Sequence, residues 1–577
     1  MTDLPVPARR ALFAGFALLL LVLLMTLAWR VLAPAGWTAW EGLILLCLLG
    51  IAPWSALSAA NALAGLALLL GTRDPPAAVL PALRRADPAA PPTLNTAVAV
   101  CIRNEDMRAV LPPLGTLLAG LPRERFSLWI LSDTQDGAAI AAEEAAMAAF
   151  RAAHPAEAAR IHYRRRTANT GFKAGNVMDF LDNHAAGQDL MLCLDADSAM
   201  TPASVLRLVA CMQADPGLAI VQQLIVGRPA TAAFPRLFQF GMRAGMRAWA
   251  TGQAWWQADE GPYWGHNAVI RIAPFRAHCR LGPLADGSRI LSHDQVEAVR
   301  LHAAGWKVCC LPLEEGSMEG NPPALPEFLA RDLRWAAGNM QYWALFNLPG
   351  MTAMGRWQLL QAILLFLGGP LWVGLLVFGA LNAATGGAEA TPRGELLALM
   401  LATWLMHYAP RLAGYLEVLL RPALAARYGG RRAFLRGVAA ETAFTAVLDP
   451  VSTLNKARFL LALPFGGRRE VWAPQNRADR GVGWADAARL LWMHTAFGAA
   501  VFGLLLATNP AAALWALPWA GGLLLAIPFC VVTASPRVSI WLGARRIAAT
   551  PEELAEADVA ATATDSPGRA GVQECTW

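Results

Sequence analysis

Charge is scarce in this 577-residue chain: only 16% of the residues are Asp, Glu, Lys or Arg, whereas 56% are hydrophobic. Soluble domains usually carry about 25% charged residues, so we expect part of the chain to lie in a lipid bilayer. The net charge is +6. The positive residues collect beside apolar segments, which fits anionic membrane lipids better than nucleic acid, so no nucleic-acid partner is expected.

Several common motifs are also missing. The nine cysteines include no Cys-x-x-Cys pair and no zinc-ligand spacing, and most of them lie in apolar runs. We therefore expect small, reduced, buried thiols rather than disulfides or a zinc site. No glycine-rich P-loop and no internal repeat is visible.

Long apolar runs flank a more polar central part. Residues 11–32 and 40–71 are each long enough to span a membrane, and the length of the first run favours a retained anchor over a cleaved signal peptide. In the second, Ser55, Ser58 and Asn61 share one helix face, for helix packing or for a polar path. Four further spans are expected at 357–381, 395–419, 488–508 and 511–534.

The stretch 438–465 is ambiguous. Asp449-Pro450 and Lys456 interrupt it, so an interfacial helix pair, a re-entrant segment or a hairpin all stay open. Arginine-rich segments at 9–10, 73–85, 421–436, 468–480 and 537–546 fall on one side if two spans precede the central part and four follow it. By the positive-inside rule, both termini and the central domain are then cytoplasmic.

The central part alternates strand-like runs with helical stretches, which predicts a mostly parallel, doubly wound sheet. Strands are expected at 97–102, 126–131, 160–163, 190–194 and 218–224. The predicted fold class is thus an α-helical polytopic membrane protein with an inserted cytoplasmic α/β domain. Its predicted parts are two spans with a linker (1–92), the α/β domain (93–348), C-terminal spans and interfacial helices (349–547) and a disordered tail (548–577).

Asp195-Ala-Asp197 directly follows the apolar run 190–194. Buried parallel strands deliver ligands at their carboxyl ends. Mg²⁺ or Mn²⁺ held by one or two carboxylates together with substrate phosphates is a common arrangement there. A lone Asp-x-Asp is more often a capping Asp followed by a turn, so the other candidates decide the interpretation.

Those candidates lie at the ends of other predicted elements. Glu105 and Asp133 follow the first two strands, where an acidic side chain can meet a ribose or a base but alone is usually a turn cap. Lys173 precedes a helix within a glycine-containing segment, a plausible diphosphate contact. Trp264 and His266 flank Gly265; the histidine is more often a structural hydrogen-bonding group than a base.

Two further groups come later in the chain. Asp294 opens an amphipathic helix, where a carboxylate is by default an N-cap. Arg331 and Arg334 lie three residues apart, on one helix face, and could clamp a diphosphate, with Trp335 beside them. A nucleotide-sugar transferase needs such a set: a nucleoside contact, carboxylates for a cation, a base, and positive groups for the leaving diphosphate.

The order of these motifs resembles the processive family-two glycosyltransferases with the GT-A fold, which include cellulose and hyaluronan synthases. More closely, Tyr263-Trp-Gly-His-Asn-Ala-Val-Ile-Arg271, Ile290-Leu-Ser-His-Asp294 and Arg331-Asp-Leu-Arg-Trp335 resemble the glucans biosynthesis glucosyltransferase H family. Its members make the β-1,2-linked glucose backbone of osmoregulated periplasmic glucans. The resemblance covers nearly the whole chain, including the late segment Val471-Trp-x-x-Gln-x-Arg477.

The resemblance implies roles for the candidate residues. Asp133 would contact the uridine of UDP-glucose, Asp195 and Asp197 would hold the Mg²⁺–diphosphate, and Asp294 would be the catalytic base of an inverting transfer. Donor binding is expected at Glu105, Asp133, Lys173, Asp195, Arg331 and Arg334. Acceptor binding is expected at Trp264, His266 and Trp335.

The implied protein is an inner-membrane synthase that passes a growing glucan through its later spans, with periplasmic glucan-modifying proteins as partners. The PilZ module of cellulose synthases is not evident, and only about ten residues precede the first span. Three alternatives stay open: another processive β-glycan synthase of the cellulose kind, a non-processive transferase acting on a lipid-phosphate carrier, and a transporter, for which Arg411 and Glu417 are the only charged candidates.

Overall fold

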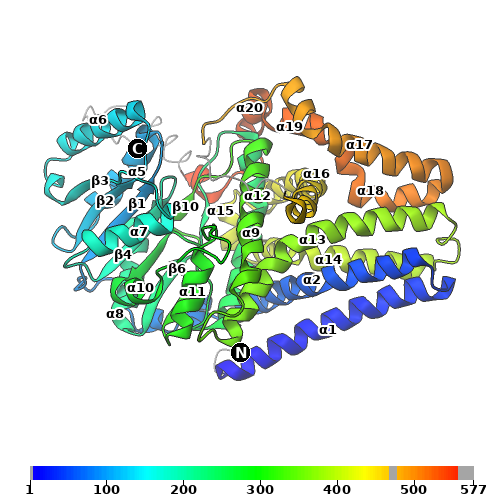
Figure 1. Cartoon of the computed structure of the whole chain (residues 1–577), viewed down its shortest axis with the longest axis horizontal. Helices are drawn as coiled ribbons and strands as arrows, with labels where there is room; N and C mark the ends of the chain where they lie inside the picture. The colour runs from blue at the N-terminus through cyan, green and yellow to red at the C-terminus, as the bar shows by residue number, and fades with distance from the viewer. Residues whose placement is uncertain (1–3, 467–476, 556–577) are drawn as a thin grey trace.

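The computed structural model describes residues 4–466 and 477–555 of the chain. A domain built around a β-sheet forms one end of the molecule, and long helices running side by side form the other (Figure 1). The first strand begins at Thr96 and the first helix of the later long-helix group begins at Ala353. The sheet domain is thus inserted between two groups of long helices.

The long helices coincide with the apolar runs expected to span a membrane. Five described helices are long and apolar enough to do so: α1 (Val6–Leu32), α2 (Ala39–Gly71), α13 (Ala353–Ala384), α14 (Arg393–Leu420) and α17 (Trp484–Thr508). A sixth span is formed if α18 (Pro510–Leu524) and α19 (Ala526–Thr533), bent by 52° at their break, count as one. The protein is therefore a membrane protein.

Three helices lie between the two ends of the molecule, across the direction of the long helices (Figure 1). These are α9 (Ala233–Gln257), α12 (Leu325–Met340) and α16 (Arg431–Ala462). The ambiguous stretch 438–465 thus belongs mostly to one continuous helix, so the hairpin and the helix pair are wrong. Asp449 and Lys456 are accommodated because Tyr408 donates a 2.7 Å hydrogen bond to Asp449 and Lys456 lies 3.3 Å from Asp332.

The polar face of α2 serves helix packing. Ser55, Ser58 and Asn61 are all buried, and Trp256 of α9 donates a 2.8 Å hydrogen bond from Nε1 to the side-chain oxygen of Asn61. Glycines let the two backbones touch: a Cβ on Gly65 would lie 1.8 Å from the carbonyl oxygen of Ala248. This close approach fixes α9, and with it the sheet domain, against the second span.

The central sheet has seven strands in the order β3-β2-β1-β4-β8-β6-β9. They are β1 (Thr96–Ile102), β2 (Phe126–Ser132), β3 (Ile161–Arg165), β4 (Leu190–Asp195), β6 (Leu218–Gln223), β8 (Ala268–Arg271) and β9 (Lys307–Leu311). The five predicted strands are present, and all neighbouring pairs are parallel except those of β8, which is antiparallel to β4 and β6. A second sheet joins β5 (Ala199–Met200), β10 (Ser317–Glu319) and β7 (Val226–Gly227).

Apolar side chains cover both faces of the central sheet, which explains why its strands read as continuous hydrophobic runs. The helices packed around it are α5 (Met107–Ala119), α6 (Gly137–Ala153), α7 (Phe172–Asn183), α8 (Pro202–Ala214), α10 (Ile272–His278) and α11 (Asp294–Ala303). This α/β domain inserted into a helical membrane protein is the GT-A arrangement expected from the sequence.

The first residues of the tail that was predicted to be disordered, 548–555, are packed against the protein. Ala548, Ala549 and Thr550 are buried, and Glu552 forms an ion pair with the buried Arg243 of α9. Residues 548–555 are therefore ordered, because a charge pair and apolar contacts hold them against α9. The rest of the predicted disordered tail lies outside the described residues.

Candidate active site

Acidic residues from three neighbouring parallel strands meet at one edge of the sheet. Glu105 follows β1, Asp133 follows β2, and Asp195 is the last residue of β4. The strands are adjacent in the order β2-β1-β4, so their carboxyl ends place the three carboxylates along one crevice. The turn after β4 adds Asp197.

Lys173 joins two parts of this crevice. It lies in the first turn of α7, which starts after Gly171 in the left-handed conformation. Its ammonium forms an ion pair with the Asp195 carboxylate and donates a 2.8 Å hydrogen bond to the carbonyl oxygen of Gly265. Burial alone would raise the pKa of Asp195, but Lys173, together with His266 and Arg477, outweighs burial and holds that pKa well below its usual range.

Asp197 and Glu105 both contact Arg477, which lies far along the sequence, after α16 and before α17. The guanidinium of Arg477 forms an ion pair with Asp197, and its Nε lies 3.3 Å from Oε2 of Glu105. Burial raises the pKa of Glu105 to about 7, although Arg477 acts in the opposite direction. The crevice thus holds two cation–carboxylate pairs side by side.

The Asp133 carboxylate forms an ion pair with a side chain of the same domain. Its two carboxylate oxygens accept hydrogen bonds of 2.7 Å each from Nε and Nη2 of Arg166, which follows β3. This bidentate pair is nearly buried. The expected uridine contact of Asp133 stays a prediction, and Arg166 fixes the carboxylate at the crevice edge.

Asp294 lies against the same loop that Lys173 contacts. It begins α11, and a Cβ built on Gly265 would lie 3.2 Å from Oδ2 of Asp294. Gly265 has a φ of +96°, so both its backbone conformation and this approach favour glycine. Burial raises the pKa of Asp294, with the nearby His293 acting in the opposite direction. A more basic carboxylate is better suited to accept a proton.

Helix α12 packs directly on the segment before Asp294. A Cβ on Gly338 would lie 2.1 Å from Oγ of Ser292, and Tyr342 donates a 2.9 Å hydrogen bond to the carbonyl oxygen of Ser292. Helix α12 also carries Arg331, Arg334 and Trp335. The structure therefore brings the predicted base and the Arg-x-x-Arg-Trp motif to one place.

Arg331 is a buried guanidinium at the inner side of this motif. It stacks over the ring of Trp335 at 4.6 Å, and the carboxylates of Glu319 and Asp197 act on it electrostatically. Its Nε has no hydrogen-bond partner among residues 4–466 and 477–555. Arg334 is also buried, whereas Trp335 is 45% exposed. The cations thus face inward and the indole faces the open side.

The remaining two candidates lie on the loop before β8. The backbone N–H of Trp264 donates a 2.6 Å hydrogen bond to Gln222, and the side chain is half-buried. His266 lies with Nε2 3.2 Å from Glu319 and Nδ1 3.2 Å from Ser198. Their expected roles at the acceptor stay predictions.

The expected metal fits the two carboxylates at the end of β4. No group of three or more His, Cys, Asp or Glu side chains suited to a metal ion occurs within the described part of the chain. A Mg²⁺–diphosphate does not need one, because one or two carboxylates and the substrate phosphates suffice. Asp195 and Asp197 retain partly exposed side chains at the crevice and supply hard oxygen donors.

Sequence reasoning assigned no site role to Arg477, Glu319 and Arg166. Arg477 ends the segment 471–477 that carries part of the family resemblance, so that segment was the available signal; residues 471–476 lie outside the described residues. Glu319 lies on a three-residue strand and Arg166 just after β3. Only the folded chain shows which carboxylates and cations they meet.

Two family models match the chain. Residues 97–279 match glycosyl transferase family 2, and residues 190–416 match glycosyl transferase family group 2. A solved structure that it resembles is a mannosyltransferase from Pyrobaculum calidifontis in complex with GDP-Man and Mn²⁺, at 18% identity over 63% of this chain and 98% of that chain, with a TM-score of 0.40.

Curated relatives match over nearly the whole length. The glucans biosynthesis glucosyltransferase H of Xanthomonas campestris pv. campestris is 31% identical, over 91% of this chain and 84% of that protein. The protein of the same name from Caulobacter vibrioides is also 31% identical, over 90% of this chain and 81% of that protein. The chain is therefore a family-two glycosyltransferase that belongs to the glucans biosynthesis glucosyltransferase H family.

Proposed function

We propose that this protein is an inner-membrane, processive, inverting glucosyltransferase. It polymerises glucose from UDP-glucose into the β-1,2-glucan backbone of osmoregulated periplasmic glucans and exports the chain. The observation that carries the proposal is the position of Gly265, whose carbonyl oxygen accepts from Lys173 while its Cα lies against Asp294. One loop thus separates the donor carboxylates from the base.

The donor end of the crevice is built for a diphosphate. Asp195 and Asp197 would hold a Mg²⁺ or Mn²⁺ ion, which when bound neutralises phosphate charge on the leaving group. Lys173 and Arg331 add positive charge at the same end. The buried Arg331 Nε without a partner among the described residues is a donor available to a phosphate oxygen. Arg477 can exchange its contact with Asp197 for a contact with the diphosphate.

The transfer step uses Asp294. Its carboxylate accepts the proton of the acceptor hydroxyl, the hydroxyl oxygen forms a bond to C1 of the glucose, and the bond from C1 to the diphosphate oxygen breaks. Attack from the side opposite the leaving group inverts the configuration at C1. Burial raises the pKa of Asp294, which favours proton uptake at this point.

Trp335 is suited to hold the acceptor sugar. Its indole is 45% exposed and is stacked from one side by Arg331, so its position is fixed while the ring stays accessible. Aromatic faces bury the apolar faces of sugars. The neighbouring Asp332 accepts a 2.9 Å hydrogen bond from Ser452 of α16, which links the acceptor helix to the membrane part.

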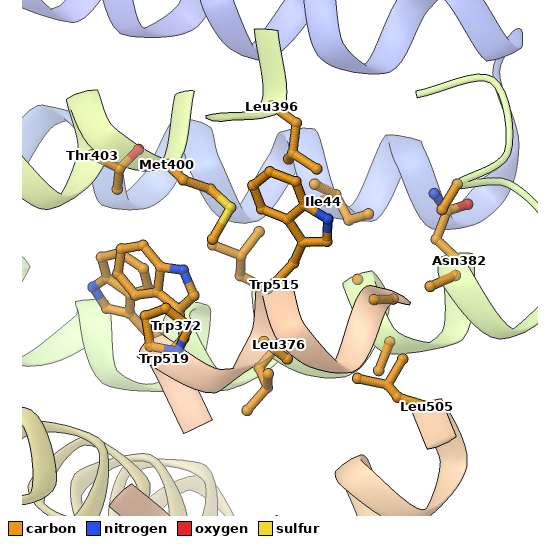
Figure 2. Close-up of a pocket in the computed structure, with 18 of the residues that line it drawn as sticks. Ile44, Trp372, Leu376, Asn382, Leu396, Met400, Thr403, Leu505, Trp515 and Trp519 are labelled. Carbon is orange, nitrogen blue, oxygen red and sulfur yellow. The ribbon is translucent and has the colours of Figure 1, made fainter. Parts of the chain in front are cut away.

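A cavity among the membrane helices, lined in part by α16, supports the export proposal. It has a volume of about 730 Å³ and is lined by residues of α1, α2, α13, α14, α16, α17 and α18. Trp372 and Trp519 lie stacked on one side of it, with ring centroids 5.2 Å apart, and Trp515 rises from α18 towards Leu396 (Figure 2). Such a cavity offers aromatic surfaces to a sugar chain along the membrane spans.

Polar groups mark both ends of this cavity. Asp449 of α16 and its hydrogen-bonded partner Tyr408 lie at the end near the sheet domain. Asn382, Arg393 and Asn509, in or beside the connections between spans, lie at the opposite end. Hydroxyl-rich sugars need such acceptors and donors where they enter and leave an apolar path. The arginine distribution of the sequence favours a cytoplasmic sheet domain, so the opposite end would face the periplasm.

The test of this function is product analysis with purified protein in vesicles containing Mg²⁺. Radiolabelled UDP-glucose, UDP-N-acetylglucosamine and GDP-mannose are supplied separately, and soluble and lipid-extractable products are compared. We expect soluble β-1,2-linked oligoglucose from UDP-glucose alone. Transfer of single sugars to lipid would instead favour the lipid-carrier transferase, and transfer from no nucleotide sugar would refute the proposal.

A further inference from the structure

His266 lies between two loops of the active site, and both of its ring nitrogens are used. Nε2 lies 3.2 Å from Oε2 of Glu319 on β10. Nδ1 lies 3.2 Å from Oγ of Ser198, in the turn that carries the Asp-x-Asp pair, and 3.2 Å from Oδ1 of Asn267. The ring therefore bridges the turn after β4 and the small second sheet.

The neighbouring Asn267 indicates that Nδ1 of His266 is a hydrogen-bond donor. The amide nitrogen of Asn267 donates to Oγ of Ser317 and to the carbonyl oxygen of Met318, so its amide oxygen faces His266. Asn267 is fully buried and has a φ of +49°, so its place is tightly fixed. Both ring nitrogens thus face oxygen acceptors, Asn267 on one side and Glu319 on the other.

Ser198 passes this constraint to the carboxylates. Its Oγ accepts a 3.0 Å hydrogen bond from the backbone N–H of Asp195, and its own backbone N–H donates to the carbonyl oxygen of Asp195. These two hydrogen bonds between Asp195 and Ser198 hold the turn, and the Ser198 hydroxyl contacts the imidazole of His266. A change at His266 therefore reaches Asp195 and Asp197 through one hydroxyl.

We propose that His266 and Glu319 form a positioning pair that holds the Asp195–Asp197 turn in place for the donor diphosphate. This assignment rests on the proposed function and replaces the acceptor contact expected of His266 from the sequence. Glu319 holds the ring through Nε2, and the ring holds Ser198 and the turn through Nδ1. Groups that orient the residues binding a metal typically change affinity or activity about 10- to 100-fold when removed.

The electrostatic surroundings agree with this geometry. Burial opposes the charged form of His266, but the carboxylates of Asp195 and Glu319 outweigh burial and the opposing Lys173, and raise the pKa of His266 to about 9. A charged imidazole donates from both nitrogens, as the two facing oxygen atoms require.

The test is UDP binding by purified full-length protein in detergent with Mg²⁺, measured by titration calorimetry. We expect His266→Ala and Glu319→Gln each to weaken UDP binding by about tenfold or more. The double variant should be no weaker than the worse single variant, because both remove the same support. His184→Ala, an exposed histidine of the same domain, should leave UDP affinity unchanged.

The outcomes separate this inference from the proposed function. If the unchanged protein binds no UDP, the proposed donor is wrong. If it binds UDP and both variants bind it equally well, the positioning role is wrong while the function stands. Should His266→Ala fail to fold, as judged by its melting in detergent, Glu319→Gln, which conserves volume, decides the question.

Discussion

Arg477 forms an ion pair with Asp197, although Asp197 follows a strand of the sheet domain and Arg477 precedes the span α17. The same guanidinium lies 3.3 Å from Glu105. Arg477, at the start of the described residues before α17, therefore lies at the donor end of the crevice. We propose that this cation contacts the phosphates when the metal–diphosphate binds beside these carboxylates.

Replacing Arg477 by Ala is expected to raise the KM for UDP-glucose by about tenfold or more, since a charged hydrogen bond contributes about 1.5–3 kcal/mol. Arg477→Lys should recover part of this loss, because it keeps the charge but not the two-sided contact with Glu105 and Asp197. Initial rates over a range of UDP-glucose concentrations measure the effect.

The matched control for Arg477 is Arg489→Ala. Arg489 lies on α17, is exposed and pairs only with the exposed Asp486 among the ion pairs found in the described residues. It should leave the KM unchanged. Equal kinetics for the Arg477→Ala protein and the unchanged protein would show that Arg477 takes no part in donor binding.

The sequence was enough to predict most of the fold. Continuous apolar runs such as 190–194 specify buried strands, and five of the six apolar runs form single long helices. The sixth, 511–534, is divided between α18 and α19, which are bent by 52° at their break. The antiparallel direction of β8 could not be predicted, because hydrophobic patterning does not report strand direction. The continuity of α16 was missed because the partners of Asp449 and Lys456, Tyr408 and Asp332, come from distant helices.

The site residues also fall into those that could be predicted from the sequence and those that could not. Residues at strand ends, such as Asp195, are found from local pattern because the topology alone brings strand ends together. Arg477, Arg166 and Glu319 could not be assigned, since a cation or carboxylate in a loop acquires meaning only from the group it meets in the fold. Asp133 shows the limit clearly: its bidentate pair with Arg166 is invisible in the sequence.

The carboxylates Asp195 and Asp197 give a prediction about metal removal. Chelation with EDTA should abolish transfer, and added Mg²⁺ or Mn²⁺ should restore it, because the metal ion supplies charge stabilisation to the leaving diphosphate that the cationic side chains do not replace. Asp197→Asn should need about tenfold more Mg²⁺ for half-maximal rate. The exposed Glu124→Gln serves as control. Full activity in EDTA would contradict the metal assignment.

The tryptophans of the membrane cavity give a prediction about product length. Trp519→Ala should shorten the glucan while leaving the initial rate of transfer within about twofold, because one aromatic contact of about 1 kcal/mol holds the passing chain. Trp492→Ala, an exposed indole on α17 that does not line the cavity, is the control. Sizing the product by chromatography measures the effect, and unaltered length would argue against export through this cavity.

His302 gives a prediction about stability and pH. Burial lowers its pKa to about 4, below the usual 6.5, so the unfolded chain binds more protons between these values. Stability should therefore fall on acidification through this window, by about 2 kcal/mol for this group between pH 7 and pH 5. Between pH 7 and pH 5, the melting temperature of the His302→Gln protein should fall by less than that of the unchanged protein. An equal loss in both would contradict the assignment.

The most direct measurement compares the unchanged protein with Asp294→Asn in vesicles supplied with radiolabelled UDP-glucose and Mg²⁺. Asparagine keeps the size of the side chain but cannot accept the proton, so glucan synthesis should fall by about a hundredfold or more. UDP affinity should stay the same, because the donor carboxylates are intact. Undiminished glucan synthesis by the Asp294→Asn protein would contradict the account of this site.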